Sequence, residues 1–102
     1  MVAKGTTPTF TFTFPNDSSV DLTQAAHVYV TFKGAQIIEK SDTDLTIAEK
    51  RVEVFLSQEE TLALSHGPIG IQINWTYADG SRAASDIVQY TISKNLIGRV
   101  LE

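Results

Sequence analysis

Ile69-Gly70-Ile71-Gln72-Ile73-Asn74-Trp75-Thr76-Tyr77 is the stretch of sequence that decides the fold. Large apolar residues alternate here with small or polar residues, and this period of two predicts a strand with one buried face. Asp79-Gly80 follows, which is a strong hairpin signal because glycine tolerates the positive φ that such turns require. The return run, from Ile87 to Ile92, alternates in the same way. This hairpin contains the single tryptophan and is predicted to form the centre of an all-β core.

Five other short segments carry strand signals, and they precede the hairpin in the chain. They are residues 9–14, 26–33, 36–39, 45–47 and 51–56. Alternation predicts the inward residues of two of them, which are Ala26, Val28, Val30 and Phe32 in 26–33, and Val52, Val54 and Leu56 in 51–56. The first of the five segments alternates threonine with phenylalanine, and both residue types favour strands. Pro8 and Pro15 bracket this segment, and proline cannot donate a hydrogen bond within a sheet, so an edge strand is predicted. Residues 20–25 are compatible with either a loop or a short helical turn.

One segment has a helical signature instead. Ser57-Gln58-Glu59-Glu60 matches a capping box, in which the serine hydroxyl and the glutamate carboxylate satisfy each other's backbone amides. Gly67-Pro68 follows soon after and ends any helix. We therefore expect one or two helical turns that cross from one sheet to another.

About seven short strands and one helix predict an all-β fold, an immunoglobulin-like antiparallel β-sandwich with one short crossover helix. A small barrel and an open sheet with one helix are the alternatives. The expected organisation is a flexible leader at residues 1–7, the sandwich domain at 8–94 and an apolar C-terminal tail at 95–102. A chain of 102 residues is long enough for one such domain.

Composition and charge limit the function classes. The chain has no cysteine, which excludes disulfides, cysteine-ligated metals and a cysteine nucleophile. The net charge is -4 and the basic residues are dispersed, which argues against nucleic acid as a partner. No segment is long and apolar enough to predict a secretory signal or a membrane span. We therefore expect a protein that is synthesised in the cytoplasm and does not bind membranes.

The reactive side chains have structural explanations at sequence level. His27 and His66 do not form a metal-binding spacing, and Asp42-Thr43-Asp44 is too short a set of ligands for a calcium loop. Glu59 and Glu60 lie in the first turn of the predicted helix, where negative charge complements the helix dipole. No catalytic, metal-binding or cofactor-binding residue is predicted, and the protein is not expected to be an enzyme.

Two features are candidates for contact with a partner. Tyr29 lies on the predicted outer face of its strand, beside His27 and Thr31, whereas the other strand aromatics alternate as core residues do. The tail is unusually apolar for a chain end, and its apolar residues are Leu96, Ile97, Val100 and Leu101. These residues either cover the protein's own sheets or dock on a neighbouring subunit, since exposed apolar patches mark interfaces.

Six segments, taken in order, resemble a known family. They are Lys4–Phe12, Leu56–Thr61, Ile71–Ile73, Asp79-Gly80, Ser85–Ile87 and Gly98–Leu101. The family consists of small proteins of about the same length, encoded among the virion structural genes of tailed phages and prophages of gut Firmicutes. The resemblance covers nearly the whole chain and implies a virion context, and it brings no catalytic residues with it.

Two functional hypotheses follow from the residues and the resemblance together. The first is a non-enzymatic, prophage-derived virion structural or accessory protein that acts through contacts with other virion proteins or with itself. The second is a small carbohydrate-binding or cell-surface-binding module with an immunoglobulin-like fold, a hypothesis that rests on aromatic content and fold analogy.

Overall fold

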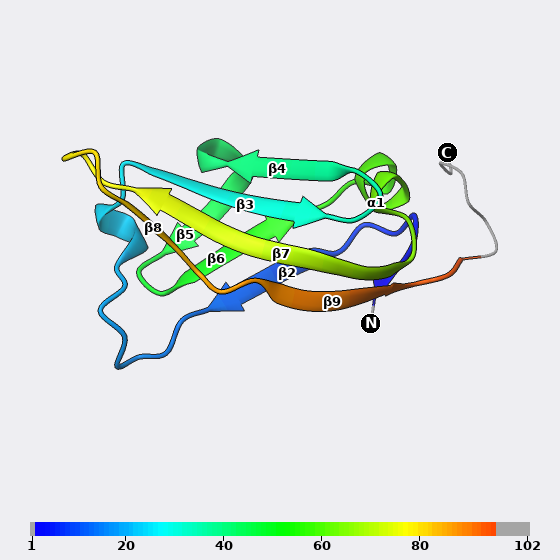
Figure 1. Ribbon diagram of the computed structural model, residues 1–102, viewed down its shortest axis with the longest axis horizontal. Coiled ribbons are helices and arrows are strands. Elements are labelled where there is room, and N and C mark those ends of the chain that lie inside the picture. The colour runs from blue at the N-terminus through cyan, green and yellow to red at the C-terminus, as the bar shows by residue number, and fades with distance from the viewer. Residues whose placement is uncertain (1, 96–102) are drawn as a thin grey trace.

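The computed structural model describes residues 2–95, and β-strands dominate this part of the chain (Figure 1). Nine strands, two turns of 3-10 helix and one α-helix are the regular elements of the described residues. In chain order they are β1 (Val2–Ala3), β2 (Thr9–Thr13), η1 (Leu22–Gln24), β3 (His27–Lys33), β4 (Ile37–Ser41), η2 (Asp42–Asp44), β5 (Leu45–Ala48), β6 (Arg51–Phe55), α1 (Gln58–Leu64), β7 (Gly67–Thr76), β8 (Arg82–Ala84) and β9 (Val88–Ser93).

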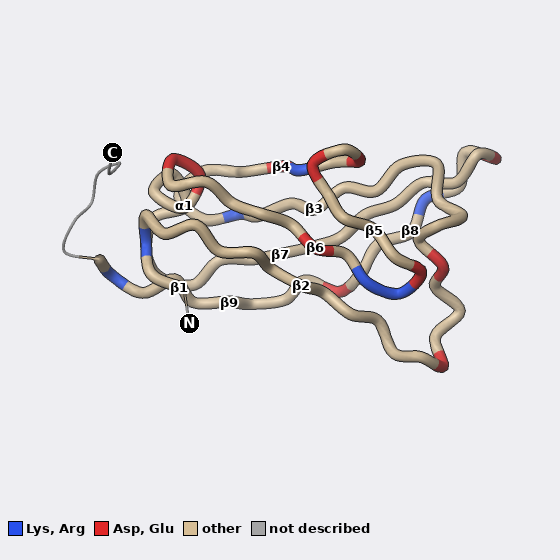
Figure 2. Tube along the Cα trace, turned by 180° about the vertical axis from the view of Figure 1, so that it is seen from behind, with Lys and Arg blue, Asp and Glu red and all other residues tan. Residues whose placement is uncertain are grey.

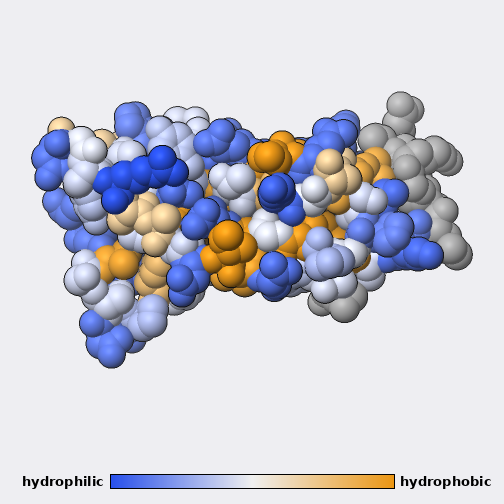
Figure 3. All heavy atoms as spheres, in the orientation of Figure 1, coloured by the Kyte–Doolittle hydropathy of each residue, from blue (hydrophilic) through white to orange (hydrophobic). Residues whose placement is uncertain are grey.

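The strands form two sheets that pack face to face. Five strands of the six-stranded sheet have the order β1-β9-β7-β3-β4. The sixth strand, β8, pairs with the C-terminal part of β7, on the same side of β7 as β9. The three-stranded sheet has the order β2-β6-β5. The larger sheet lies nearer the viewer in Figures 1 and 3, and the smaller sheet is nearer in Figure 2.

The strand order is that of an immunoglobulin-like sandwich. β9, β7, β3 and β4 occupy the positions of strands G, F, C and C′, and β2, β6 and β5 occupy those of B, E and D. The predicted all-β sandwich with one short crossover helix is therefore confirmed. The strand count differs, with nine strands instead of about seven, because β1 is an additional strand and the return arm of the hairpin is divided into β8 and β9. β1 also pairs with β9 in parallel, whereas all other pairs are antiparallel.

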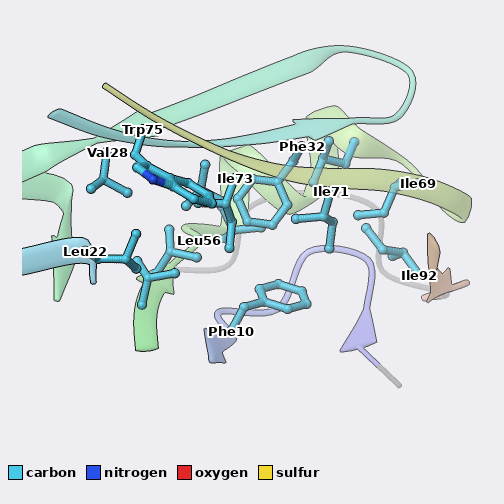
Figure 4. Packing of buried hydrophobic residues seen from close by; sticks show 14 residues of the cluster. Phe10, Leu22, Val28, Phe32, Leu56, Ile69, Ile71, Ile73, Trp75 and Ile92 are labelled. Carbon is cyan, nitrogen blue, oxygen red and sulfur yellow. The ribbon is translucent and has the colours of Figure 1, made fainter. Parts of the chain in front are cut away.

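The core lies between the two sheets, as Figure 4 shows. β7 contributes every second residue of its alternating run, and Trp75 is 4% exposed. The buried hydrophobic residues are Phe10, Leu22, Val28, Val30, Phe32, Val52, Val54, Leu56, Leu64, Ile69, Ile71, Ile73, Trp75 and Ile92. The period-two pattern therefore identified the inward faces of β3, β6 and β7 correctly.

β2 is an edge strand, as its flanking prolines predicted. Phe10 is buried, and its ring contacts those of Phe32 and Tyr90, with centroid distances of 5.5 and 5.2 Å. The strand's threonines are exposed on the opposite face. The core is thus joined to this edge by aromatic contacts that cross from the small sheet to the large one.

α1 carries the chain from the small sheet to the large one. Ser57 and Glu60 form the predicted capping box: the Ser57 Oγ accepts from the Glu60 amide at 3.2 Å, and the Glu60 carboxylate accepts from the Ser57 amide at 2.9 Å. The helix ends where Ser65 and Gly67 take positive φ values of 66° and 106°. These two residues turn the chain so that β7 can begin at once.

Residues 2–7, which the sequence predicted to be a flexible leader, contact the domain. Val2 and Ala3 pair with Ile92 and Ser93 of β9. Thr61 of α1 is fully buried, and its Oγ1 donates to the Thr6 carbonyl at 2.8 Å. The segment before β2 is therefore held at both ends.

Candidate interaction surface

The outer face of the six-stranded sheet carries the predicted contact residue Tyr29. Val28 and Val30 of β3 point into the core, so Tyr29 points outward, as the sequence predicted. Tyr29 lies opposite Asn74 of β7 and Ser41 of β4 in the sheet register. Because residues directly opposite in a sheet share a face, the sheet gathers polar side chains from three strands around Tyr29.

A shallow groove crosses this face. Its first part is a hollow of about 320 Å³, lined by Tyr29, Thr31, Glu39, Asn74, Thr76 and Arg82. Its second part is a hollow of about 310 Å³, lined by Thr31, Lys33, Gly70, Gln72, Asn74, Arg82 and Ile87. The two parts share Thr31, Asn74 and Arg82, and we call their combined lining the outer groove.

Arg82 is fixed in position at the middle of the outer groove. Its Nε and Nη2 both donate to the Asn74 Oδ1, at 3.3 and 3.0 Å. Arg82 begins β8, which pairs with β7, so its backbone is also held by the sheet. With Lys33 and Glu39, the groove lining has two cations and one anion, in a chain whose net charge is -4.

Ile87 closes one end of the groove because the return arm of the hairpin contains a bulge. β8 pairs Asn74 with Ala84, whereas β9 pairs Ile71 with Val88, so the return arm holds one extra residue between the two registers. Ser85 fills the gap: its amide donates to the Ile73 carbonyl at 2.8 Å, and its Oγ accepts from the Ile73 amide at 3.0 Å.

The bulge directs Ile87 onto the outer face, where it is 63% exposed. Gly70 leaves the space that Ile87 occupies, since a Cβ at Gly70 would lie 3.3 Å from a methyl group of Ile87. Val88 is 49% exposed next to it. Figure 3 shows hydrophobic side chains gathered near the junction of β8 and β9, in the middle of a face that is otherwise mostly polar.

A second, more apolar depression lies at the side of the sandwich, where β2 and the return arm approach each other. It has a volume of about 240 Å³ and is lined by Thr11, Phe12, Thr13, Phe14, Ile73, Ser85 and Val88. We call it the lateral hollow. It opens between the two sheets rather than on the outer face of either one.

His27 and Asp42 meet near the outer groove, and this pair was not foreseen from the sequence. The Asp42 Oδ2 lies 2.8 Å from the His27 Nδ1, and the Asp42 Oδ1 accepts from the Val28 amide at 3.0 Å. The hydrogen bond with His27, and next the one from Val28, hold the pKa of the Asp42 carboxyl below its usual value. The register of the β3–β4 hairpin would have revealed the pair, since Tyr29 opposite Ser41 places Asp42 beside Val28.

Glu60 has a structural role, as predicted. Partial burial raises the pKa of Glu60, but hydrogen bonds from Lys40 and Ser57 outweigh this effect, so that the pKa lies below its usual value. The Lys40 Nζ is 2.7 Å from the Glu60 Oε2. The carboxylate therefore caps α1 and ties it to β4.

The remaining predicted contact residues, Leu96, Ile97, Val100 and Leu101, lie outside the described residues. Within residues 2–95, no cluster of three or more His, Cys, Asp or Glu side chains is arranged to hold a metal ion. No helix in the described part of the chain is both long and apolar enough to cross a membrane.

Comparison of the chain with models of known protein families, with curated proteins and with solved structures finds no match.

Proposed function

We propose that this protein is a non-enzymatic structural or accessory protein of a phage or prophage virion, and that it binds other virion proteins through the outer groove. The observation that carries the binding role is the groove itself, which brings Tyr29, Arg82 and Ile87 together on one face. The resemblance to virion-region proteins supports the setting in which this binding takes place.

The lining of the groove has the composition of a protein-binding surface. Tyrosine and arginine are enriched at interfaces and dominate the residues whose truncation weakens binding most. Tyr29 and Arg82 are held on neighbouring parts of a rigid sheet, and Arg82 is fixed further by Asn74. Ile87 adds an exposed apolar side chain at the end of the groove, which a partner would cover.

The virion role is tested by mass spectrometry of phage particles induced from the source organism and purified. Peptides of this chain should copurify with capsid and tail proteins at a definite copy number. Cross-linking within the same particles should then identify the protein that contacts the face around Tyr29. Particles that form normally without this chain would contradict the virion role.

The groove is tested separately, with the neighbour that cross-linking identifies. Tyr29→Ala and Arg82→Ala should each weaken binding to that protein by roughly 30-fold, the effect of losing a central interface residue. Thr46→Ala, at the exposed position of β5 in the other sheet, is the control and should leave affinity unchanged. Thermal unfolding of each variant separates loss of binding from loss of fold. Equal affinities for all three variants would show that the partner binds elsewhere.

One observation favours the alternative role in carbohydrate binding. Tyr29 presents an aromatic ring beside the amide of Asn74 and the guanidinium of Arg82, and these groups can together contact the apolar and polar sides of a sugar. A glycan panel tests this role with the same variants. Binding that Tyr29→Ala abolishes would favour it, and no binding to any glycan would leave the virion role as the better proposal.

A further inference from the structure

We propose that the open edge of β2 is a self-association site, at which β2 strands of two copies pair antiparallel about a two-fold axis. The pairing would join two three-stranded sheets into one continuous six-stranded sheet. This inference does not depend on the outer groove, because β2 belongs to the other sheet of the sandwich.

The backbone of β2 leaves one set of amides and carbonyls pointing away from the domain. The Leu56 amide donates to the Pro8 carbonyl, and the Phe14 amide donates to the Lys50 carbonyl. Because hydrogen-bonded and non-hydrogen-bonded pairs alternate in an antiparallel ladder, the even-numbered residues of β2 bond to β6. Thr9, Thr11 and Thr13 therefore direct their N–H and C=O groups to the open edge.

No strand within residues 2–95 pairs with that edge. Proteins normally protect such an edge with charged side chains, prolines, bulges or a covering segment, because an unprotected edge is a template for another strand. The two prolines here flank β2 and do not lie within its five residues. β2 carries no charged residue, and none occurs from Pro8 to Pro15. Figure 2 shows the uncharged strand, with the charged turn between β5 and β6 beside one end of it.

The sequence of β2 is complementary to itself. If two copies pair with Thr11 opposite Thr11, Thr9 lies opposite Thr13, and all three outward-pointing threonines form hydrogen-bonded pairs. Phe10 of each copy then lies opposite Phe12 of the other, on the face that turns toward the core. Threonine pairs and aromatic pairs across strands both stabilise sheets, so no position in this register opposes pairing.

The surroundings of the edge also favour a second copy. The lateral hollow opens beside β2, and its apolar lining includes Phe12, Phe14 and half-exposed Val88. A strand added at β2 would extend over this hollow and place its own phenylalanines there. The same addition of an extended strand to a sheet edge is a common mode of protein recognition.

Single-cysteine variants test both the association and its register, because the chain has no cysteine of its own. In the proposed register the two Thr11 Cα atoms lie about 5.5 Å apart, within the range of a disulfide. The two Thr9 Cα atoms lie about 14 Å apart, four residues along the strand, which is beyond that range. Thr9 and Thr11 are both exposed on the same face, so Thr9→Cys is a matched control.

Under mild oxidation Thr11→Cys should form a disulfide-linked dimer at least tenfold faster than Thr9→Cys, since only its thiols are adjacent. An equal mixture of Thr9→Cys with Thr13→Cys should cross-link to roughly half the extent of Thr11→Cys alone, because only the heterodimers place the two thiols side by side. Equal rates for Thr11→Cys and Thr9→Cys would show random collision and overturn the proposal. The absence of any cross-link at high protein concentration would do the same.

A charge-swap pair provides an independent measurement in solution. Thr11→Lys or Thr11→Glu alone should weaken dimerisation of the full chain by roughly fivefold or more in sedimentation equilibrium, because like charges would lie directly opposite. Mixing the two variants should restore association as a heterodimer. Thr46→Lys on β5 should have no effect. A monomeric unmodified chain, or a dimer that ignores both Thr11 variants, would overturn the proposal.

Discussion

The three-stranded sheet has two edges, and they differ in how they are protected. β5 is four residues long, and Asp44 precedes it while Glu49 follows it. A strand this short, with an acidic residue at each end, discourages another chain from pairing along its edge. β2 is longer and carries no charge. The prolines at positions 8 and 15 limit the length of the strand but do not lie on its open edge. One sheet thus has an edge that resists pairing and an edge that favours it.

The two edges also differ in how deeply their inward side chains are buried, and substitution to alanine is expected to show the largest effect. Phe10→Ala should reduce the free energy of unfolding by about 3–5 kcal/mol, because the ring is buried and fills space between the sheets. Ile47→Ala on β5 should cost only about 1–2 kcal/mol, since Ile47 is partly exposed. Urea unfolding measures both, and equal losses would show that the edges contribute alike to the core.

The segment that leads into β2 is held by a neutral hydrogen bond, which gives a smaller effect. Thr61→Val keeps the shape of the buried side chain but removes the donor to the Thr6 carbonyl, at an expected cost of about 1 kcal/mol. Hydrogen exchange should then accelerate at the Leu56 amide, which donates to the Pro8 carbonyl. It should not accelerate at the amides that form hydrogen bonds between β5 and β6. Uniform acceleration at both edges would mean that Thr61 stabilises the whole domain rather than the start of β2.

The segment that leads into β5 is held by a charge, so it should respond to acid, and the effect should be the smallest. The pKa of Asp42 is lower in the folded protein than its ordinary value, so its contribution is present at neutral pH and is lost as the pH falls through the folded pKa. Asp42→Asn should therefore lower the melting temperature slightly at about pH 7, and the difference should shrink as the pH falls through the folded pKa of Asp42. A difference that persists in acid would show that the charge is not the cause.

The fold was predictable because its patterns are local. Alternation identified the inward faces of β3, β6 and β7, the prolines identified β2 as an edge, and Ser57 with Glu60 identified the start of α1. Each of these signals depends only on residues that are close in sequence, and tertiary packing did not override any of them.

The bulge could not be predicted from the sequence, because it depends on the register between β7 and β8. The inward residues of β7 are odd-numbered, and Ala83 of β8 lies opposite Trp75, but the inward residues of β9 are even-numbered. A regular hairpin cannot change parity along one arm, so an extra residue had to lie between β8 and β9. The parity of β7 and β9 alone is satisfied either by a turn of different length or by a bulge, and the pairing of Thr76 with Arg82 decides for the bulge.

The candidate surface was predicted only in part. Tyr29 was found because the strand's alternation is strict, but its neighbours on the outer face come from β4, β7 and β8. Their arrangement depends on sheet order and register, which one strand's sequence does not contain. The pairing of β1 with β9 was missed for the same reason, since Val2-Ala3 is too short to carry a pattern.

That parallel pairing has a mechanical consequence. The Lys4 amide donates to the Ser93 carbonyl, and the Asn95 side chain donates to the Lys4 carbonyl, so both ends of the described chain are attached to each other. Because β1 and β9 run in the same direction, tension applied to the two ends would load these bonds in shear, all at once, instead of opening them one after another. A pull on the ends is therefore resisted first at β1, before any force reaches the core.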